Sequence, residues 1–196
     1  MYNHLQQKQD KSIDTSTGDY VVKVKEIYQE HDPISGALVQ TDIIHNEIHK
    51  GDYYRVLNRT TASLGQYARM VVRTSTEVHP HIISKMSSKK GCEVFLYKNA
   101  IATGGTTLTA QNANQGSTNV CETVFVSNPT ITTTGTQIDA DLIGSSDVNP
   151  VNPGIGGGLA HNYEWLLDIG TTYELRALSL GNNNVVYIKN GFYEEP

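Results

Sequence analysis

Apolar and polar residues alternate most regularly near the end of the chain. Three such runs, YEWLLDI, TTYELRALSL and NNNVVYIKNGFYEE, are separated by Gly170-Thr171 and by a polar turn at residues 181–183. In the second run, Tyr173, Leu175 and Ala177 fall on one face of an extended chain. A period of two residues predicts strands with one buried face. The short turns between them predict that the three strands form an antiparallel meander.

Shorter runs of the same kind begin at Ile43. They are IIHNEIHK, YYRV, ARMVVRTS, HPHIISKMSS and GCEVFLYKN, spaced by roughly 8 to 14 residues. In the first run, His45, Glu47 and His49 alternate with Ile44 and Ile48, which predicts a strand. Strands at this spacing are typical of a sandwich or barrel.

Polar segments interrupt this pattern twice. Residues 100–119 predict a surface loop or a loosely paired hairpin tip, because they contain too few apolar residues for a core. Residues 145–162 are rich in Gly and Pro and predict a second loop. Between them, PTITTTGTQIDADLIG predicts one further strand.

The first 40 residues differ from the rest. Residues 1–12 are polar without periodicity, whereas residues 20–29 alternate and are followed by Pro33 and Gly36, which predicts a β-hairpin. We therefore expect an N-terminal arm and hairpin over residues 1–40. Residues 41–196 are expected to form an all-β, antiparallel, jelly-roll-like β-sandwich.

Composition supports β structure and narrows the classes of partner. Thr, Asn, Ser and Gly dominate the uncharged polar residues, a mixture that favours strands and turns. The net charge is −5 and the basic residues are scattered, so nucleic-acid binding is not expected. The apolar runs are far shorter than the roughly 20 residues that span a bilayer, and no signal peptide is evident. We expect a protein made and kept in a cytoplasm, with no membrane partner.

The low cysteine content is consistent with a protein kept in a cytoplasm. Cys92 and Cys121 each lie in an apolar, strand-like run. Buried, reduced thiols are the expectation, and a cross-strand disulfide formed after cell lysis is the alternative.

The histidines are the first candidates for metal binding. His79 and His81, or Glu47 with either neighbour, are two residues apart on a strand face and close enough to share an ion. His45 and His49 would be roughly 13 Å apart, too far to do so. Two ligands do not make a metal centre, so surface or interface histidines are expected and a metal site is the alternative.

Catalytic candidates are equally sparse. Asp139 and Asp141 share a strand face, so paired carboxylates of a glycosidase or a calcium site are alternatives to solvated side chains. The chain has no G-x-S-x-G nucleophile motif, and its glycine cluster lacks the ending of a phosphate-binding loop. We expect no catalytic residue, no cofactor and no metal ligand.

Partner contacts are expected instead from tyrosines, histidines and the arm. Eleven tyrosines against three phenylalanines favour half-buried sheets and interfaces, and an exposed strand in the arm can pair with another chain's sheet. The candidate interface residues are Tyr20, Val22, Val24, Ile27, Tyr28, His45, His49, Tyr53, Tyr54 and Tyr193.

A series of short motifs resembles a family of small virion structural proteins of tailed bacteriophages, described as head decoration, head-fibre or minor capsid proteins. The matching residues, in order, are His49-Lys50-Gly51-Asp52, Gly104-Gly105-Thr106-Thr107-Leu108-Thr109, Glu164-Trp165, Thr172-Tyr173 and Phe192-Tyr193-Glu194. The resemblance covers residues 43–195. It departs from the family at Lys50, where an acidic residue is usual, and at Phe192, where tryptophan is usual.

The resemblance implies an oligomeric β-sandwich on the particle surface, a homotrimer, without cofactor or catalytic residues. We expect a non-enzymatic virion protein, assembled in the host cytoplasm, that acts as a capsid decoration protein. It would bind the major capsid protein or other virion proteins and stabilise the assembled shell by mass action. The alternatives are a head-fibre or tail-associated module that binds host-surface glycans through residues 100–119 and 145–162, and a hydrolase built on Asp139 or Asp141.

Overall fold

The computed structural model describes residues 43–144 and 164–195, together with four two-residue strands nearer the N-terminus. The chain divides into two compact units, Met1–His45 and Asn46–Pro196. In the first unit, β1 (Gln6–Gln7) pairs with β2 (Ile27–Tyr28), and β3 (Glu30–His31) pairs with β4 (Leu38–Val39), both antiparallel. The β3–β4 pair flanks Pro33 and Gly36, where a hairpin was predicted, but it does not include the alternating residues 20–29, of which Ile27–Tyr28 pair with β1 instead.

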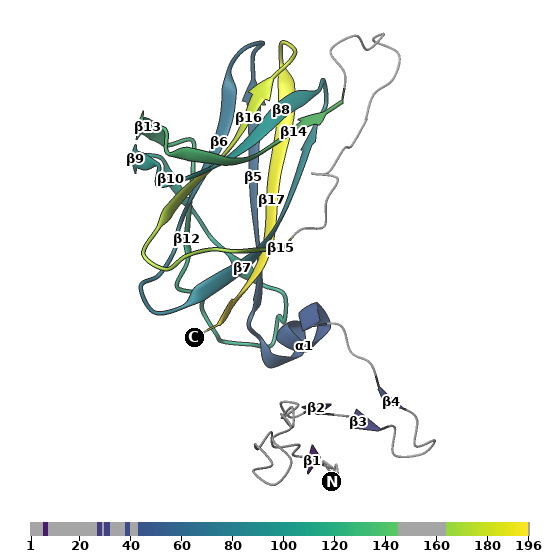
Figure 1. Cartoon of the computed structure of the whole chain (residues 1–196). Helices are drawn as coiled ribbons and strands as arrows, with labels where there is room; N and C mark the ends of the chain where they lie inside the picture. The colour runs from purple at the N-terminus through teal and green to yellow at the C-terminus, as the bar shows by residue number, and fades with distance from the viewer. Residues whose placement is uncertain are drawn as a thin grey trace, which may run out of the picture. The chain divides into compact units, whose positions relative to one another are not determined.

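The second unit is a sandwich of two antiparallel sheets (Figure 1). The six-stranded sheet has the order β10-β12-β6-β16-β8-β14 and the five-stranded sheet the order β11-β5-β17-β7-β15. The bounds are β5 (Tyr53–Ala62), β6 (Tyr67–Arg73), β7 (His79–Ser88), β8 (Cys92–Lys98), β10 (Thr106–Leu108), β11 (Gln111–Asn112), β12 (Val124–Ser127), β14 (Thr136–Ile143), β15 (Glu164–Leu166), β16 (Thr172–Ser179) and β17 (Asn184–Glu195).

This strand order is that of a jelly roll. The neighbours β5, β17, β7 and β15 form one set of four, and β6, β16, β8 and β14 form the other. The chain crosses between the sheets at nearly every step, so few sequence neighbours pair. The predicted all-β, jelly-roll-like sandwich is confirmed. An insertion between β8 and β14 adds β10 and β12 to the edge of the six-stranded sheet and β11 to the edge of the five-stranded sheet.

The predicted C-terminal meander is wrong. All three strands exist, but β16 lies between β6 and β8 in one sheet, whereas β17 lies between β5 and β7 in the other. The turns after β15 and β16 therefore carry the chain from sheet to sheet. A period of two specifies which residues face the core, and it says nothing about which strand lies alongside.

The predicted strand over IIHNEIHK is also wrong, because these residues form the helix α1 (Ile43–Lys50). Gly51, with a φ of 82°, ends the helix. Its N–H donates to the Ile48 carbonyl at 3.1 Å, and the Asp52 N–H donates to the Glu47 carbonyl at 2.9 Å, as in a Schellman cap. The signal was present in the sequence, since Ile44 and Ile48 have helical spacing and glycine follows basic residues.

The region after β8 contains more strands than predicted. The stretch predicted as a loop at 100–119 includes β9 (Ile101–Thr103), β10 and β11, which pair with β13 (Thr130–Thr133), β12 and β5. The one strand predicted for PTITTTGTQIDADLIG is two, β13 and β14. The loop predicted at 145–162 lies outside the described residues.

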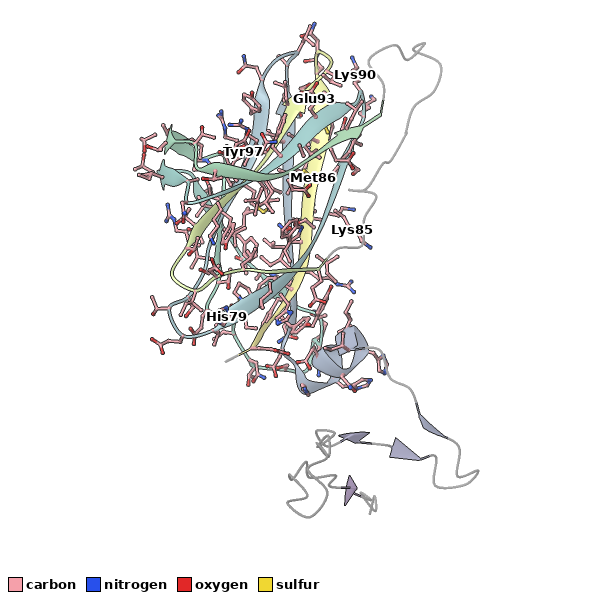
Figure 2. All side chains as sticks on the ribbon, in the orientation of Figure 1. His79, Lys85, Met86, Lys90, Glu93 and Tyr97 are labelled. Carbon is pink, nitrogen blue, oxygen red and sulfur yellow. The ribbon has the colours of Figure 1, made fainter. Side chains whose placement is uncertain are left out.

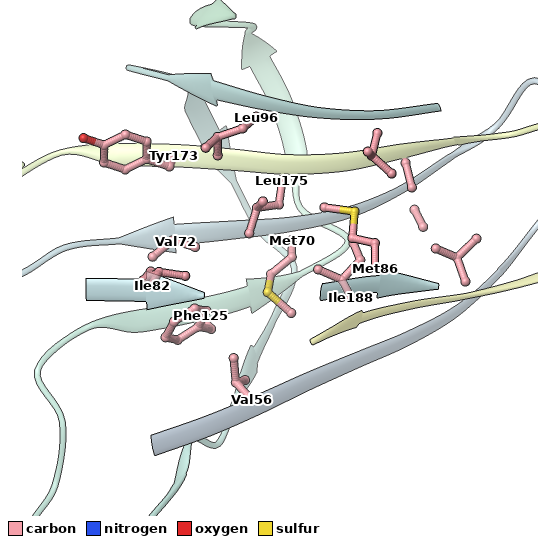
Figure 3. Close-up of a cluster of buried hydrophobic side chains, with 14 of the residues drawn as sticks. Val56, Met70, Val72, Ile82, Met86, Leu96, Phe125, Tyr173, Leu175 and Ile188 are labelled. Atoms are coloured by element: carbon pink, nitrogen blue, oxygen red, sulfur yellow. The ribbon is translucent and has the colours of Figure 1, made fainter. Parts of the chain in front are cut away.

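A single apolar core lies between the sheets (Figure 3). The ring of Phe192, which is fully buried, lies 5.4 Å from the Tyr54 ring and 4.9 Å from the Phe125 ring, centroid to centroid. Phe125 belongs to the six-stranded sheet and the other two belong to the five-stranded sheet. The aromatic cluster therefore bridges the two layers.

Replacing Phe192 tests this packing. Phe192→Ala is expected to lower the free energy of unfolding by about 3–5 kcal/mol, because it leaves a cavity between rings that the β-scaffold cannot collapse to fill. Urea unfolding followed by tyrosine and tryptophan fluorescence measures the loss. Leu57→Ala is the matched control, because Leu57 is 50% exposed and should change stability by less than about 0.5 kcal/mol. Equal losses in the two variants would contradict this account of the core.

Candidate interaction surface

The outer face of the six-stranded sheet carries a mixture of aromatic, apolar and charged side chains. Residues directly opposite each other on paired strands share a face. Val94 and Leu96 of β8 are buried in the core, so the intervening Phe95 points outward. Its partners in register are Arg176 of β16 and Ala140 of β14.

Glu174 of β16 lies on this outer face and is nevertheless fully buried. The Nε atom of Arg69 donates to Glu174 Oε1 at 3.2 Å, and an Nη atom of Arg176 lies 3.8 Å from Oε2. Burial raises the pKa of Glu174, and the two guanidinium groups beside it offset only part of that rise. Two cations and one carboxylate therefore form a compact charged cluster on the surface of a β-sheet.

Aromatic rings hold Arg176 in place. Its guanidinium carbon lies 4.0 Å from the ring centroid of Tyr97, 4.9 Å from that of Tyr67 and 5.4 Å from that of Phe95. The Tyr97 hydroxyl accepts a hydrogen bond from Arg176 and donates one to Gln137 Oε1 at 3.0 Å. Stacking of a planar guanidinium on aromatic rings restricts its rotamers, so this part of the surface is preorganised.

An apolar patch continues from this cluster to the edge of the sheet. Leu142 of β14 is 57% exposed, Ala140 is exposed, and Phe95 and Leu178 are half-buried. The register places Leu142 opposite Glu93, and Glu93 opposite Leu178, so these side chains adjoin on the outer face. We call Phe95, Ala140, Leu142 and Leu178 the β14 patch. The patch surrounds the half-buried Glu93, and apolar area next to Arg and aromatic side chains is the usual composition of a protein–protein contact.

The carboxylates of β14 lie on the opposite side of that strand. Asp139 and Asp141 are opposite Leu96 and Val94 in register, and both are half-buried. Their Oδ1 atoms accept hydrogen bonds from the backbone N–H of the next residue, at 2.8 Å and 2.7 Å. Inward-pointing charges and a bulge, which β14 has beside Asp139, are features that keep an edge strand from pairing with another sheet.

The structure places three of the predicted interface tyrosines in the interior. Tyr53, Tyr54 and Tyr193 are 7%, 3% and 1% exposed. Tyr54 packs in the core, and Tyr53 lies so close to Gly191 that a side chain there would collide with the ring. These tyrosines contribute to the fold and offer almost no surface to a partner.

Of the other predicted contact residues, the structure describes the side chains of some and not of others. His45 and His49 are exposed, on the helix α1 and not on a strand. Ile27 and Tyr28 form β2, whose side chains are not described. Tyr20, Val22 and Val24 lie outside the described residues. A partner-binding role for the arm stays a prediction.

His79 and His81 do not converge on a common ligand position. The Nδ1 atom of His79 lies 3.1 Å from the Leu167 carbonyl oxygen. The ring of His81 stacks on Tyr193 at 4.5 Å, with Nδ1 2.8 Å from Glu164 Oε1 and Nε2 3.4 Å from Glu195 Oε2. Among the residues that the structure describes, no group of three or more His, Cys, Asp or Glu is arranged to hold a metal ion.

Both cysteines are free thiols in the structure. Burial raises the pKa of Cys92 and of Cys121 to about 11, so both stay protonated and poorly nucleophilic at neutral pH. Cys92 begins β8 as predicted, whereas Cys121 precedes β12 and lies outside any strand.

Comparisons with family models, with curated proteins and with solved structures found no match to this chain. In the parts of the chain that are described, no helix is long and apolar enough to cross a membrane.

Removing one cation from the buried cluster should make stability depend on pH. Arg176→Met is expected to cost about 3 kcal/mol at neutral pH, because it leaves Glu174 buried with one partner. The folded-state pKa of Glu174 is already above its ordinary value of 4.5, and losing Arg176 raises it further. The folded variant then binds a proton more readily than the unfolded chain, so the cost shrinks as the pH falls from neutral toward about 4.5.

Urea unfolding at a series of pH values measures this dependence. Arg73→Met is the control, because the exposed Arg73 donates to the Ala102 carbonyl oxygen at 3.2 Å, whereas the salt bridges of Glu174 are with Arg69 and Arg176. A loss in Arg176→Met that stays constant with pH would show that Arg176 stabilises through its aromatic contacts and not through Glu174.

Proposed function

We propose that this protein is a non-enzymatic structural protein of a tailed-bacteriophage virion, a capsid decoration protein that binds the assembled shell and stabilises it. The observation that carries the proposal is the β14 patch beside the Arg176 cluster on a jelly-roll sandwich. Such a surface suits contact with protein, and jelly rolls recur in viral capsid proteins.

The motifs that resemble phage virion proteins occupy positions that matter to the fold. Gly51 caps α1, and Phe192 is central to the core. Gly105, with a φ of 86°, leaves no room for a side chain, because a Cβ would lie 2.6 Å from Val126. These motif residues have structural roles in the sandwich, and they bring no catalytic group with them.

The proposed mechanism is stabilisation by mass action. A protein that binds the assembled shell and not the free shell subunits makes disassembly less favourable by the free energy of its binding, summed over many copies. The decoration protein acts as a homotrimer, in which the β14 patch is covered by a neighbouring subunit. The partner is the major capsid protein or another virion protein.

A charge placed in the patch tests the trimer. Leu142→Glu is expected to raise the dissociation constant of the oligomer by about tenfold or more, because it desolvates a carboxylate at an apolar contact. Leu64→Glu is the matched control, since Leu64 is 58% exposed and Leu142 57% exposed. Analytical ultracentrifugation over a concentration series gives both constants. Identical self-association of the two variants would rule out the patch as the subunit contact.

Shell binding is the direct test of the proposed function. Purified protein is incubated with shells that lack it, and bound copies are counted after sedimentation. Saturable binding at a multiple of the shell symmetry is expected, and the chain without residues 1–40 should bind more weakly if the arm docks on the shell. Absence of saturable binding by the full chain would refute the capsid proposal. Tail components and host-surface glycans would then be tested as partners.

A further inference from the structure

The outer face of the five-stranded sheet gathers basic side chains. Arg55 and Arg59 of β5, Lys85 of β7 and Lys189 of β17 are all exposed there. In register, Lys189 is directly opposite Lys85 and, on its other side, opposite Leu57, which lies between the two arginines. Opposite residues have Cβ atoms roughly 5 Å apart and diagonal ones roughly 7–8 Å apart, so the other three cations adjoin Lys189. We call these four residues the basic face.

The basic face points away from the core. Figure 2 shows Lys85 directed outward, whereas Met86, the next residue of β7, lies within the sandwich and is 1% exposed. Tyr187 lies between two of the cations. Its ring is 5.9 Å from the Arg59 guanidinium and 5.7 Å from the Lys189 ammonium, and its hydroxyl accepts a hydrogen bond from Arg59 Nε at 3.3 Å.

The described residues supply no carboxylate to these cations. The salt bridges found in this part of the chain involve Lys50, Arg69, His81, Lys98 and Arg176 and none of the basic face. Glu164 of β15 borders the face, but its Oε1 atom bonds His81 and Tyr193. Two lysines opposite each other repel, and the whole chain has a net charge of −5. A concentration of like charge against that background indicates a surface for an anionic partner.

We infer that the basic face binds a carboxylate-rich surface of another protein. This inference rests on the proposed function, in which the other protein belongs to the virion shell. Arg55 and Arg59 offer guanidinium groups that pair with carboxylates in bidentate geometry. The basic face and the β14 patch lie on different sheets, so one subunit can contact its copies and the shell at once.

Apolar neighbours favour a protein partner over nucleic acid. Leu57, 50% exposed, and the half-buried Ile83 and Tyr187 lie among the cations, a mixture that suits a protein contact. Glu164, on the edge strand β15, and Glu195, at the end of β17, would repel a long polyanion that continued past the four cations.

The test compares two double variants with the same change in charge. Lys85→Gln/Lys189→Gln removes two cations of the basic face, and Lys89→Gln/Lys90→Gln removes two exposed cations of the turn between β7 and β8. Binding to shells that lack the protein is measured by sedimentation at about 50 mM and about 300 mM NaCl. The face variant is expected to bind about tenfold more weakly than the control and to depend less on salt. Equal affinity of the two variants for the shell would overturn the inference and leave the decoration role intact.

If the full chain binds no shell, a second binding experiment tests the basic face. Retention on immobilised poly-L-glutamate should then fall in the face variant and not in the control, and equal retention would overturn the inference. Tighter, face-dependent binding of duplex DNA would overturn it in favour of nucleic acid.

The chain's own residues 1–42 contain seven acidic and four basic residues. If removing them raises retention of the wild-type protein severalfold, the face is occupied by this segment and the inference of an outside partner falls.

Discussion

The insertion of β16 and β17 into the centres of the two sheets is the constraint on which the rest of the structure depends. β17 pairs along its length with β5 and β7, and β16 pairs with β6 and β8. Both come from the end of the chain, whereas their partners come from its first half. Neither sheet is continuous without them, and the aromatic contact of Phe192 that joins the layers belongs to β17. A fold dominated by such distant pairings forms slowly, because the chain must close long loops before the pairings repay that entropy.

This constraint also explains how much of the fold could be predicted from the sequence. Alternation in TTYELRALSL correctly placed Tyr173, Leu175 and Ala177 on one face of a strand, because the two-residue period is a local property of a strand, and the structure shows that this face lies in the core. The meander failed, because pairing in a jelly roll is decided by residues far apart in the chain. The helix α1 was missed because its alternating histidines and isoleucines match the strand period, although Gly51 marks a helix end.

The candidate surfaces were harder to predict than the core, for the same reason. Lys85 and Lys189 are neighbours only because β7 and β17 pair, and Arg69 and Glu174 meet only because β6 and β16 pair. The high tyrosine content led to the opposite error, because tyrosines predicted to lie at an interface are buried in the fold. Tyr193 has the polar tip of an interface residue, but its hydroxyl donates to Glu164 on the neighbouring part of the same sheet. A polar tip identifies a residue that needs a partner, and it does not say whether that partner is in the same subunit.

The two outer faces differ in whether their cations are paired with a carboxylate of the same subunit. On the six-stranded sheet, Arg69 and Arg176 form ion pairs with Glu174 within the subunit, and these pairs offset the cost of burying its carboxylate. What remains available there is the apolar area of the β14 patch around Glu93. On the five-stranded sheet, the cations of the basic face have no carboxylate among the described residues and remain available to another molecule. Because a jelly roll builds its core between the sheets, both outer faces are free to carry contacts without cost to packing. A subunit with an apolar patch on one outer face and a cluster of cations on the other has two chemically distinct surfaces, which is the arrangement that binding to copies of itself and to a different partner requires.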